Sequence, residues 1–244
     1  MKMFEIDDCL LAESRKLYEK SLENSWNSIF RDLGKIYAPN RLVLLSGTTG
    51  AGKSRVSLGE ALNALQLGKK VLYIHTEMSD EQVCSILYKN WNVTYNKMLT
   101  VASINTFDEF IEIYKCTKKF ENYDLIIFDY LDANLFTYSS EIPMFQKLNN
   151  TIRSFDGIRK EDTFHGCFLI LSQLNGRVNE RNSLDALDLA GAKGVERSVD
   201  YHFSISPADD GMLNLSVRKD RYAITKQRNL SVHFNYTTLD SLPF

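Results

Sequence analysis

Short apolar runs alternate along most of this chain with stretches in which apolar residues recur every three or four positions. The most continuous runs lie at residues 42–45, 71–75, 125–128 and 167–171. Such runs are typical of strands buried on both faces of a parallel sheet, and the stretches between them are typical of amphipathic helices. A shorter strand is expected at residues 99–101. The alternation predicts an α/β fold with a mostly parallel central sheet flanked by helices.

Several of the expected helices have recognisable ends. Ser79 with Gln82, and Thr106 with Glu109, have the spacing of capping boxes, in which each side chain accepts a hydrogen bond from the backbone N–H of the other residue. Gly68 follows the last apolar position of the helix expected after residue 54. We therefore expect two helices to begin near residues 79 and 106, and a third to end before residue 68.

The two ends of the chain depart from this alternation. Residues 9–37 keep a helical rhythm, in which Trp26 and Phe30 are expected to pack on the core. Beyond residue 200, short alternating segments predict an antiparallel extension of the sheet. Because no linker rich in Gly, Pro or Ser divides the chain, we expect a helical arm at residues 1–24 and a single domain at residues 25–244.

Composition and charge narrow the possible functions. Hydrophobic residues make up 44% and charged residues 25%, as in ordinary globular proteins, and the net charge of −2 means that any DNA contact requires a local basic patch or a pore. The four cysteines lack C-x-x-C spacing, and Cys84 and Cys167 are expected to be buried. No signal peptide or membrane-length apolar run is visible, so we expect a cytoplasmic protein without membrane contact.

Residues 47–54 read Gly-Thr-Thr-Gly-Ala-Gly-Lys-Ser and match the phosphate-binding pattern G-x-x-x-x-G-K-[ST] between an expected strand and an expected helix. In this pattern backbone N–H groups surround the phosphates, the lysine contacts the β- and γ-phosphates, and the hydroxyl binds Mg²⁺. A glycine-rich turn without a ligand is the structural alternative. The candidate site for ATP and Mg²⁺ is Gly47, Thr48, Thr49, Gly50, Ala51, Gly52, Lys53 and Ser54.

Three polar residues follow apolar strands whose carboxyl ends are expected at this same edge of the sheet, where ligands bind in open α/β folds. Asp129 is the candidate second metal ligand, and its alternative role is to cap a turn. Glu77 is the candidate base for water if its strand neighbours the P-loop strand, and its alternative role is that of a first-turn helix acid. The amide of Gln173 is placed to hydrogen-bond a γ-phosphate.

Five segments resemble, in their order and spacing, the ATPase domain of DnaB-type hexameric replicative helicases. They are VLYIHTEMSDEQV, LIIFDYLD, LILSQLNGRVNERN, DLAGAKGVERSVD and ITKQRN. The resemblance extends from about residue 26 to about residue 234. It implies a RecA-like P-loop NTPase fold and an ATP-hydrolysing helicase that forms a ring, a hexamer in this family, on single-stranded DNA.

The resemblance also implies a role for each candidate residue. Lys53 and Ser54 correspond to the phosphate and metal ligands, and Asp129 corresponds to the Walker B acid. Glu77 corresponds to the catalytic base, and Gln173 to the sensor of the γ-phosphate.

Other cations correspond to residues that act on a neighbour or on DNA. Lys226 and Arg228 resemble the pair inserted into the adjacent subunit's site, with Arg228 as the arginine finger; the alternative is a basic surface turn. The loops of the family that hold single-stranded DNA correspond here to segments with solvated or DNA-binding cations, namely Arg177, Arg181, Lys193 and Arg197.

The chain also departs from the family pattern. Ala190 stands where the family's DNA loop carries an arginine, for which Lys193 is a compensating cation, and Asp132 stands where the family usually has a glutamine. No collar domain or primase is expected, and the arm at residues 1–24 is expected to contact the next subunit or a loader protein. A stripped-down helicase of a phage or mobile-element replication system is the leading interpretation. A RecA-like recombination mediator or KaiC-like regulatory ATPase, and an ATP-binding loader module without unwinding activity, remain alternatives.

Overall fold

The computed structural model describes residues 8–91, 96–117, 122–131, 144–161, 163–173, 195, 197–208, 212–225, 228–234 and 241–242. In chain order, the first half contains α1 (Asp8–Glu23), η1 (Arg31–Leu33), β1 (Leu42–Gly47), α2 (Lys53–Gln66), β2 (Val71–His75), α3 (Asp80–Trp91), β3 (Leu99–Ser103) and α4 (Phe107–Thr117). The second half contains β4 (Leu125–Leu131), α5 (Met144–Ile158), β5 (Cys167–Gln173), β6 (Tyr201–Pro207), β7 (Met212–Asp220), β8 (Asn229–Phe234) and β9 (Ser241–Leu242).

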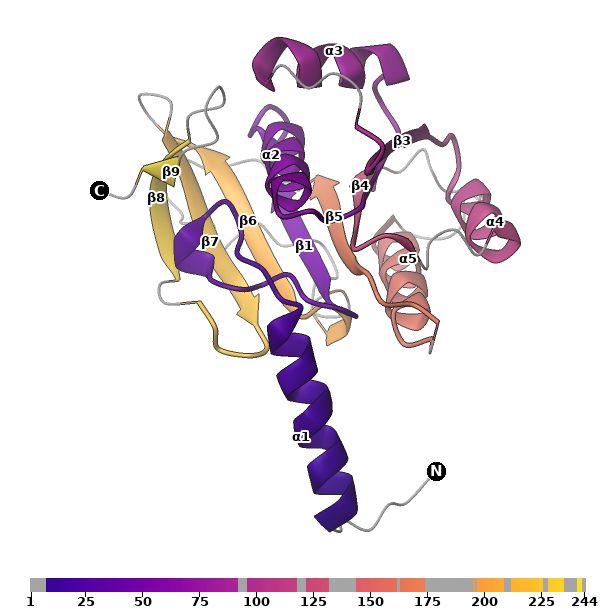
Figure 1. The fold of residues 1–244 in the computed structure, drawn as a ribbon. Coiled ribbons are helices and arrows are strands. Elements are labelled where there is room, and N and C mark those ends of the chain that lie inside the picture. Colours follow the sequence, from indigo (N-terminus) through magenta and orange to yellow (C-terminus); the bar gives the residue numbers. More distant parts are fainter. Residues whose placement is uncertain are drawn as a thin grey trace.

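The described strands form one sheet in the order β3-β2-β4-β5-β1-β6-β7-β8-β9. The strands from β3 to β6 are parallel, and β7, β8 and β9 continue the sheet in antiparallel fashion (Figure 1). This confirms the predicted α/β architecture. The antiparallel extension begins later than expected, because β6 pairs in parallel with β1. Its alternating pattern arises from polar residues that are buried and bonded, such as His202, whose Nε2 lies 2.8 Å from Ser46 Oγ.

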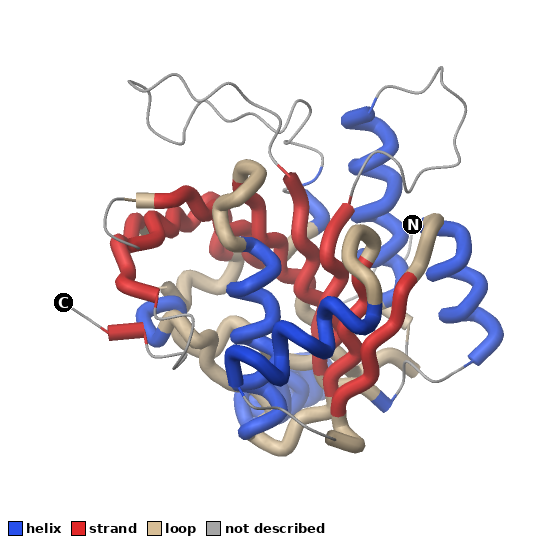
Figure 2. The backbone as a smooth tube through the Cα atoms, turned by 90° about the horizontal axis from the view of Figure 1, so that it is seen from above, coloured by secondary structure: helices blue, strands red, loops and turns tan. Residues whose placement is uncertain are grey.

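Helices cover both faces of the sheet, and each face has its own hydrophobic core. On one face, α2, α3 and residues 26–37 pack against the strands. On the other face, α4 and α5 contribute Phe107, Phe110 and Phe155 to an aromatic cluster with strand residues. Figure 2 shows the strands between these two layers of helices. Continuous apolar runs are therefore required in the central strands, because neither face of the sheet meets water.

The predicted capping boxes are confirmed. The Ser79 N–H donates to Gln82 Oε1 at 2.8 Å, and the Gln82 N–H donates back to Ser79 Oγ at 3.3 Å. The same reciprocal pair joins Thr106 and Glu109 at the start of α4. Gly68, at φ 73°, follows the end of α2 as expected.

The helix expected over residues 9–37 is wrong beyond residue 23. The helix α1 ends at Glu23 and extends away from the sheet (Figure 1), and the following segment folds back so that Trp26 pairs with Tyr37. The buried Glu60 carboxylate accepts hydrogen bonds from Ser28 Oγ and the Ile29 N–H, and so holds this segment on α2. Tertiary contacts thus override the local helical pattern, while Trp26 and Phe30 are buried as predicted. The division of the chain at residue 24 stays a prediction.

The cysteine prediction is half confirmed. Cys167 is buried in β5, whereas Cys84 is exposed. On α3 the positions that face the core are Val83 and Leu87, and Cys84 lies one residue away from that face. Among the described residues, no helix is both long enough and apolar enough to cross a membrane.

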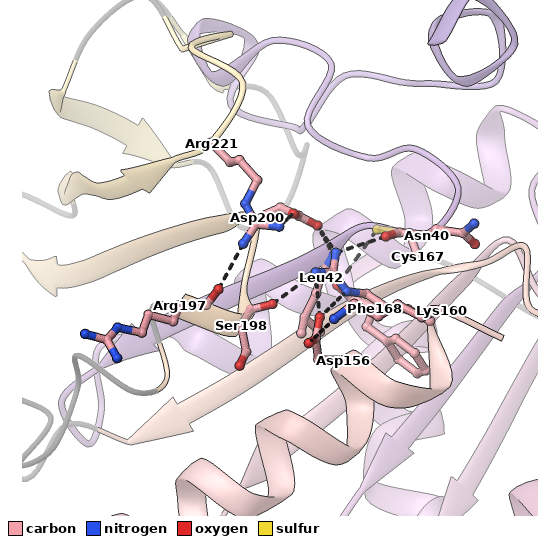
Figure 3. Close-up of polar contacts among 11 residues, drawn as sticks. Asn40, Leu42, Asp156, Lys160, Cys167, Phe168, Arg197, Ser198, Asp200 and Arg221 are labelled. Carbon is pink, nitrogen blue, oxygen red and sulfur yellow. Dashed lines mark hydrogen bonds and ion pairs between the residues drawn. The ribbon is translucent and has the colours of Figure 1, made fainter. Parts of the chain in front are cut away.

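A network of buried charges closes the amino-terminal end of β1 (Figure 3). Asp200, which is 0% exposed and directly precedes β6, accepts hydrogen bonds from the guanidinium groups of Arg159 and Arg221 and from the Leu42 N–H. Arg159 also donates to the carbonyls of Asn40 and Ser198. These contacts join the end of α5, the start of β1 and the turn after β7.

Candidate active site

The P-loop connects the carboxyl end of β1 to the first residue of α2. Gly50 and Gly52 have φ angles of 77° and 89°, in the left-handed region where glycine carries no steric penalty. Gly47 has a different role from the predicted one, because a Cβ on it would lie 2.7 Å from the Ile205 carbonyl of β6. Gly47 therefore permits close strand packing, and Gly50 and Gly52 permit the turn. The N-terminal N–H groups of α2 are left facing this turn, which is an arrangement that binds anions.

A pocket of about 420 Å³ opens beside the loop. Its lining brings together three predicted parts of the site, since Glu77 and Gln173 lie in it with Lys53. The remaining lining residues are Thr49, Gly50, Gly52, Ser54, Arg55 and Tyr130. The polar residues predicted from the strand ends thus converge with the loop at one sheet edge.

Lys53 is buried, with 8% of its surface exposed, and its Nζ donates to the carbonyls of Gly47 at 3.0 Å and Thr48 at 2.9 Å. Burial lowers the pKa of Lys53, and the charges of Asp129 and Glu77 oppose that change. The lysine is held inside the loop by neutral acceptors. A phosphate would supply the full negative charge that these carbonyls lack.

Asp129 is 3% exposed and lies within β4, two residues before the strand ends. Burial raises the pKa of this carboxyl, while hydrogen bonds from Tyr73 and Ser54 and the charge of Lys53 act in the opposite direction. Tyr73 Oη donates to Asp129 Oδ2. The acid is therefore fixed beside the Ser54 hydroxyl, and its charge is only partly compensated.

Glu77 is exposed and lies two residues after the end of β2. The condition attached to its predicted role is wrong, because β4 and β5 separate β2 from β1. Glu77 nevertheless lines the pocket, since the segment that follows β2 borders it. Thr76 anchors this segment to β4 through the hydrogen bond from its Oγ1 to the Tyr130 carbonyl at 3.1 Å.

Gln173 is the last residue of β5, and β5 is the neighbour of β1. Its Nε2 donates to Thr49 Oγ1 in the P-loop at 2.7 Å. The amide therefore contacts the loop directly and lies at the rim of the pocket. A change in its contacts at the phosphate would be transmitted to the segment that follows β5.

Three further residues of the site carry no signal that a motif would reveal. Arg55 and Tyr130 line the pocket one residue beyond Ser54 and Asp129. Tyr73 has the apolar neighbours of an ordinary strand residue, and only its contact with Asp129 distinguishes it. Adjacency to a predicted residue could have suggested Arg55 and Tyr130, whereas Tyr73 required the strand order.

Arg228 lies just before β8 and is exposed, and its carbonyl accepts the Val217 N–H at 2.7 Å. Because β8 is three places from β1 in the sheet, roughly 14 Å separates the two strands. Arg228 therefore does not line the pocket of its own chain. The other predicted cations, Lys226, Arg177, Arg181 and Lys193, lie outside the described residues, and Arg197 contributes its carbonyl to Arg221 at 2.9 Å.

These residues fit a magnesium nucleotide. Lys53 and Asp129 are both buried, and the pKa of each is displaced toward the neutral form. Polyphosphate beside Lys53 and a cation beside Asp129 and Ser54 would compensate both charges. Among the described residues, no group of three or more His, Cys, Asp or Glu side chains could hold a metal. One carboxylate and one hydroxyl are the small protein contribution expected where phosphates and water complete the coordination of Mg²⁺.

Solved structures of other proteins share this fold. The chain is similar to a helicase ATPase domain solved on its own, with a TM-score of 0.73 and 14% identity over 100% of both chains. It is similar to a DnaB-like replicative helicase whose interactions with primase have been described, with a TM-score of 0.72 and 15% identity over 96% of this chain and 66% of that one.

Two other likenesses widen the set. A KaiC-like protein, PH0186 from Pyrococcus horikoshii OT3, has a TM-score of 0.62 at 14% identity over 88% of this chain and 95% of that one. The RadB recombinase has a TM-score of 0.60 at 16% identity over 86% and 94%. No protein-family model and no curated protein sequence matches the chain. The chain therefore has the RecA-like fold, in the form found in the ATPase domain of DnaB-type helicases.

Proposed function

We propose that this protein is a Mg²⁺-dependent ATPase that assembles as a ring, a hexamer, and translocates on single-stranded DNA as a replicative helicase of a phage or mobile element. One observation carries the proposal. A P-loop, a buried acid beside its hydroxyl, an exposed glutamate and a strand-end glutamine surround one pocket. The likeness to helicase ATPase domains supports the choice of helicase among the RecA-like functions.

Each residue has a distinct task in this proposal. Lys53 and the first N–H groups of α2 bind the phosphates, and Ser54 and Asp129 hold Mg²⁺, which when bound neutralises charge on the phosphate oxygens. Glu77 is exposed at the pocket and accepts a proton from the attacking water. Gln173 contacts the γ-phosphate and links it to the P-loop through Thr49.

A cation from the next protomer completes the site. Arg228 is exposed and lies away from the pocket of its own chain, as an arginine supplied in trans must. Lys226 is proposed to act with it. An arginine finger contributes about 10³- to 10⁵-fold in rate in comparable NTPases, so hydrolysis would depend on assembly.

DNA binding is proposed for the basic residues that follow β5. Several copies of Arg177, Arg181 and Lys193 around a ring would form a positive channel despite the net charge of −2 of each chain. A loader or a primase is a further proposed partner, since one of the similar helicases was described with primase.

Substitution of the two pocket residues with the clearest roles tests the enzyme assignment. Glu77→Gln is expected to bind ATP with wild-type affinity and to hydrolyse it at least about 10²-fold more slowly, because the base is lost while the phosphate contacts remain. Wild-type hydrolysis should increase when single-stranded DNA is added. A wild-type protein without turnover under every DNA condition would leave only the ATP-binding loader module.

Mixing two inactive variants tests the shared site. Arg228→Ala keeps Glu77, and Glu77→Gln keeps Arg228, so a mixed ring regains active interfaces at about a quarter of its sites if protomers combine at random. Arg228→Lys serves as the control that keeps the charge but not the guanidinium. Failure of the mixture to exceed the sum of its parts, in rings shown to have mixed, would contradict the trans assignment.

The second candidate is a recombination mediator or regulatory ATPase, which the likeness to RadB and to the KaiC-like protein favours. Strand displacement from a forked duplex with ATP would select the helicase. Filaments instead of closed rings in electron micrographs, together with no displacement, would select the mediator.

A further inference from the structure

Tyr73 connects the interior of the sheet to the acid of the candidate metal site. It lies in β2, is 0% exposed, and its Oη donates a hydrogen bond of 2.5 Å to Asp129 Oδ2 in the adjacent strand β4. The ring lies in the hydrophobic core on the α2 face of the sheet. Only the hydroxyl of this side chain therefore has a polar task.

The same hydroxyl is tied to the helix that follows the P-loop. Ser57 Oγ lies 3.0 Å from Tyr73 Oη and donates to the Ser54 carbonyl at 2.9 Å. Tyr73 has one hydroxyl proton, which the carboxylate takes, so Ser57 must share its own proton between Ser54 and Tyr73. The chain of contacts runs from the residue that carries the candidate Mg²⁺ hydroxyl, through two hydroxyls, to the candidate Mg²⁺ acid.

Burial raises the pKa of Tyr73 well above its ordinary value, and the neighbouring Asp129 charge raises it further. The phenol therefore stays protonated and remains a donor at all physiological pH values. A donor to one oxygen of a carboxylate restricts rotation of that group and favours its ionised form. The remainder of the Asp129 carboxylate faces Ser54, which also hydrogen-bonds to it.

We propose that Tyr73 is a positioning residue for the magnesium site: its hydroxyl fixes the Asp129 carboxylate in the orientation that, with Ser54, binds Mg²⁺. This inference rests on the proposed function, because it needs a magnesium nucleotide in the pocket. Partners of this kind, which orient a metal ligand without touching the metal, typically change metal affinity about 10- to 100-fold when removed.

The test is Tyr73→Phe, which removes only the hydroxyl, measured with a fluorescent ADP analogue in EDTA and across a Mg²⁺ titration. We expect unchanged affinity in EDTA, because Lys53 and the loop are untouched, and a half-saturating Mg²⁺ concentration raised about 10-fold. Ser57→Ala should raise it by a smaller factor, since it acts through Tyr73. The Ser57 variant also serves as the test if Tyr73→Phe does not fold.

Tyr37→Phe is the matched control. Tyr37 is equally buried, at 1% exposed, but its hydroxyl bonds to Glu60, away from the pocket. This variant should lose stability and keep the wild-type Mg²⁺ dependence. An unchanged Mg²⁺ requirement in folded Tyr73→Phe, or an equal shift in Tyr37→Phe, would overturn the positioning role. If the wild-type protein binds no nucleotide, or if Mg²⁺ has no effect on its binding, the proposed function itself fails.

Discussion

The two ends of β1 treat buried charge in opposite ways. At the amino end, the carboxylate of Asp200 lies between Arg159 and Arg221 and also accepts the Leu42 N–H (Figure 3). At the carboxyl end, Lys53 and Asp129 are also buried, yet burial moves the pKa of each toward its neutral form. The first group of charges is compensated within the chain, whereas the second is compensated only in part.

This difference separates a structural role from a binding role. Removing charges from water is costly unless nearby partners offset that cost, so a fully partnered carboxylate reports on the fold. Buried charges whose pKa values are displaced toward neutrality mark a place where a charged ligand gains free energy by binding. The comparison therefore locates function at the carboxyl end of β1, independently of the P-loop motif.

Substitution of Asp200 should have the largest effect. Asp200→Ala leaves the guanidinium of Arg159, which is 6% exposed, without its buried anion, and we expect a loss of about 3–5 kcal/mol in the free energy of unfolding. Urea denaturation followed by circular dichroism measures this loss. Asp200→Asn, which keeps an acceptor oxygen, should lose less. A loss below about 1 kcal/mol for the alanine variant would show that the network is not structural.

Lys53→Ala should give the reverse pattern. Two charge-assisted contacts to phosphate are lost, so nucleotide affinity should fall by about 10²-fold or more, while the free energy of unfolding changes by less than about 1 kcal/mol. Calorimetric titration with ADP and urea denaturation measure the two quantities. Lys53→Met is the control that keeps the aliphatic stem and loses the charge. Equal nucleotide affinity in Lys53→Met and wild type would remove the charge from the argument.

Glu60 sharpens the comparison with a smaller effect. It is 2% exposed and accepts hydrogen bonds from Ser28 and the Ile29 N–H, and burial raises its pKa from its ordinary value of 4.5 to about 7. Since the folded protein holds this proton more tightly than the unfolded chain, its contribution to stability is fully present below pH 4.5 and is lost as the pH rises to about 7. The expected slope is at most about 1.4 kcal/mol per pH unit.

Urea denaturation of wild type and Glu60→Gln between pH 5 and pH 7 isolates this slope. The glutamine variant should show a flatter dependence, because its side chain does not titrate. Identical slopes in the two proteins would mean that neutral donors compensate the Glu60 carboxylate as well as arginines compensate Asp200.

Much of the fold could be predicted because it rests on local rules. Continuous apolar runs identified the central strands, and Ser79 and Thr106 marked the starts of two helices through pairs only three residues apart. The segment after Glu23 could not be predicted in this way. Its path depends on Glu60, more than thirty residues away, and on the pairing of Trp26 with Tyr37.

The candidate site divides along the same line. Residues 47–54 follow from a motif of eight consecutive residues, and the strand ends gave Glu77, Asp129 and Gln173 their common edge. The strand order explains why the partner of Asp129 is Tyr73, since β2 lies next to β4 and not next to β1.

The sequence by itself determined the alternation of strands and helices, the phosphate loop and the identity of the polar residues at the strand ends, because these depend on spacing along the chain. Only the tertiary structure decided which strands are neighbours, which charges have partners and which tyrosine holds the acid. Those outcomes depend on contacts between segments far apart in sequence, whose free energies no local pattern encodes.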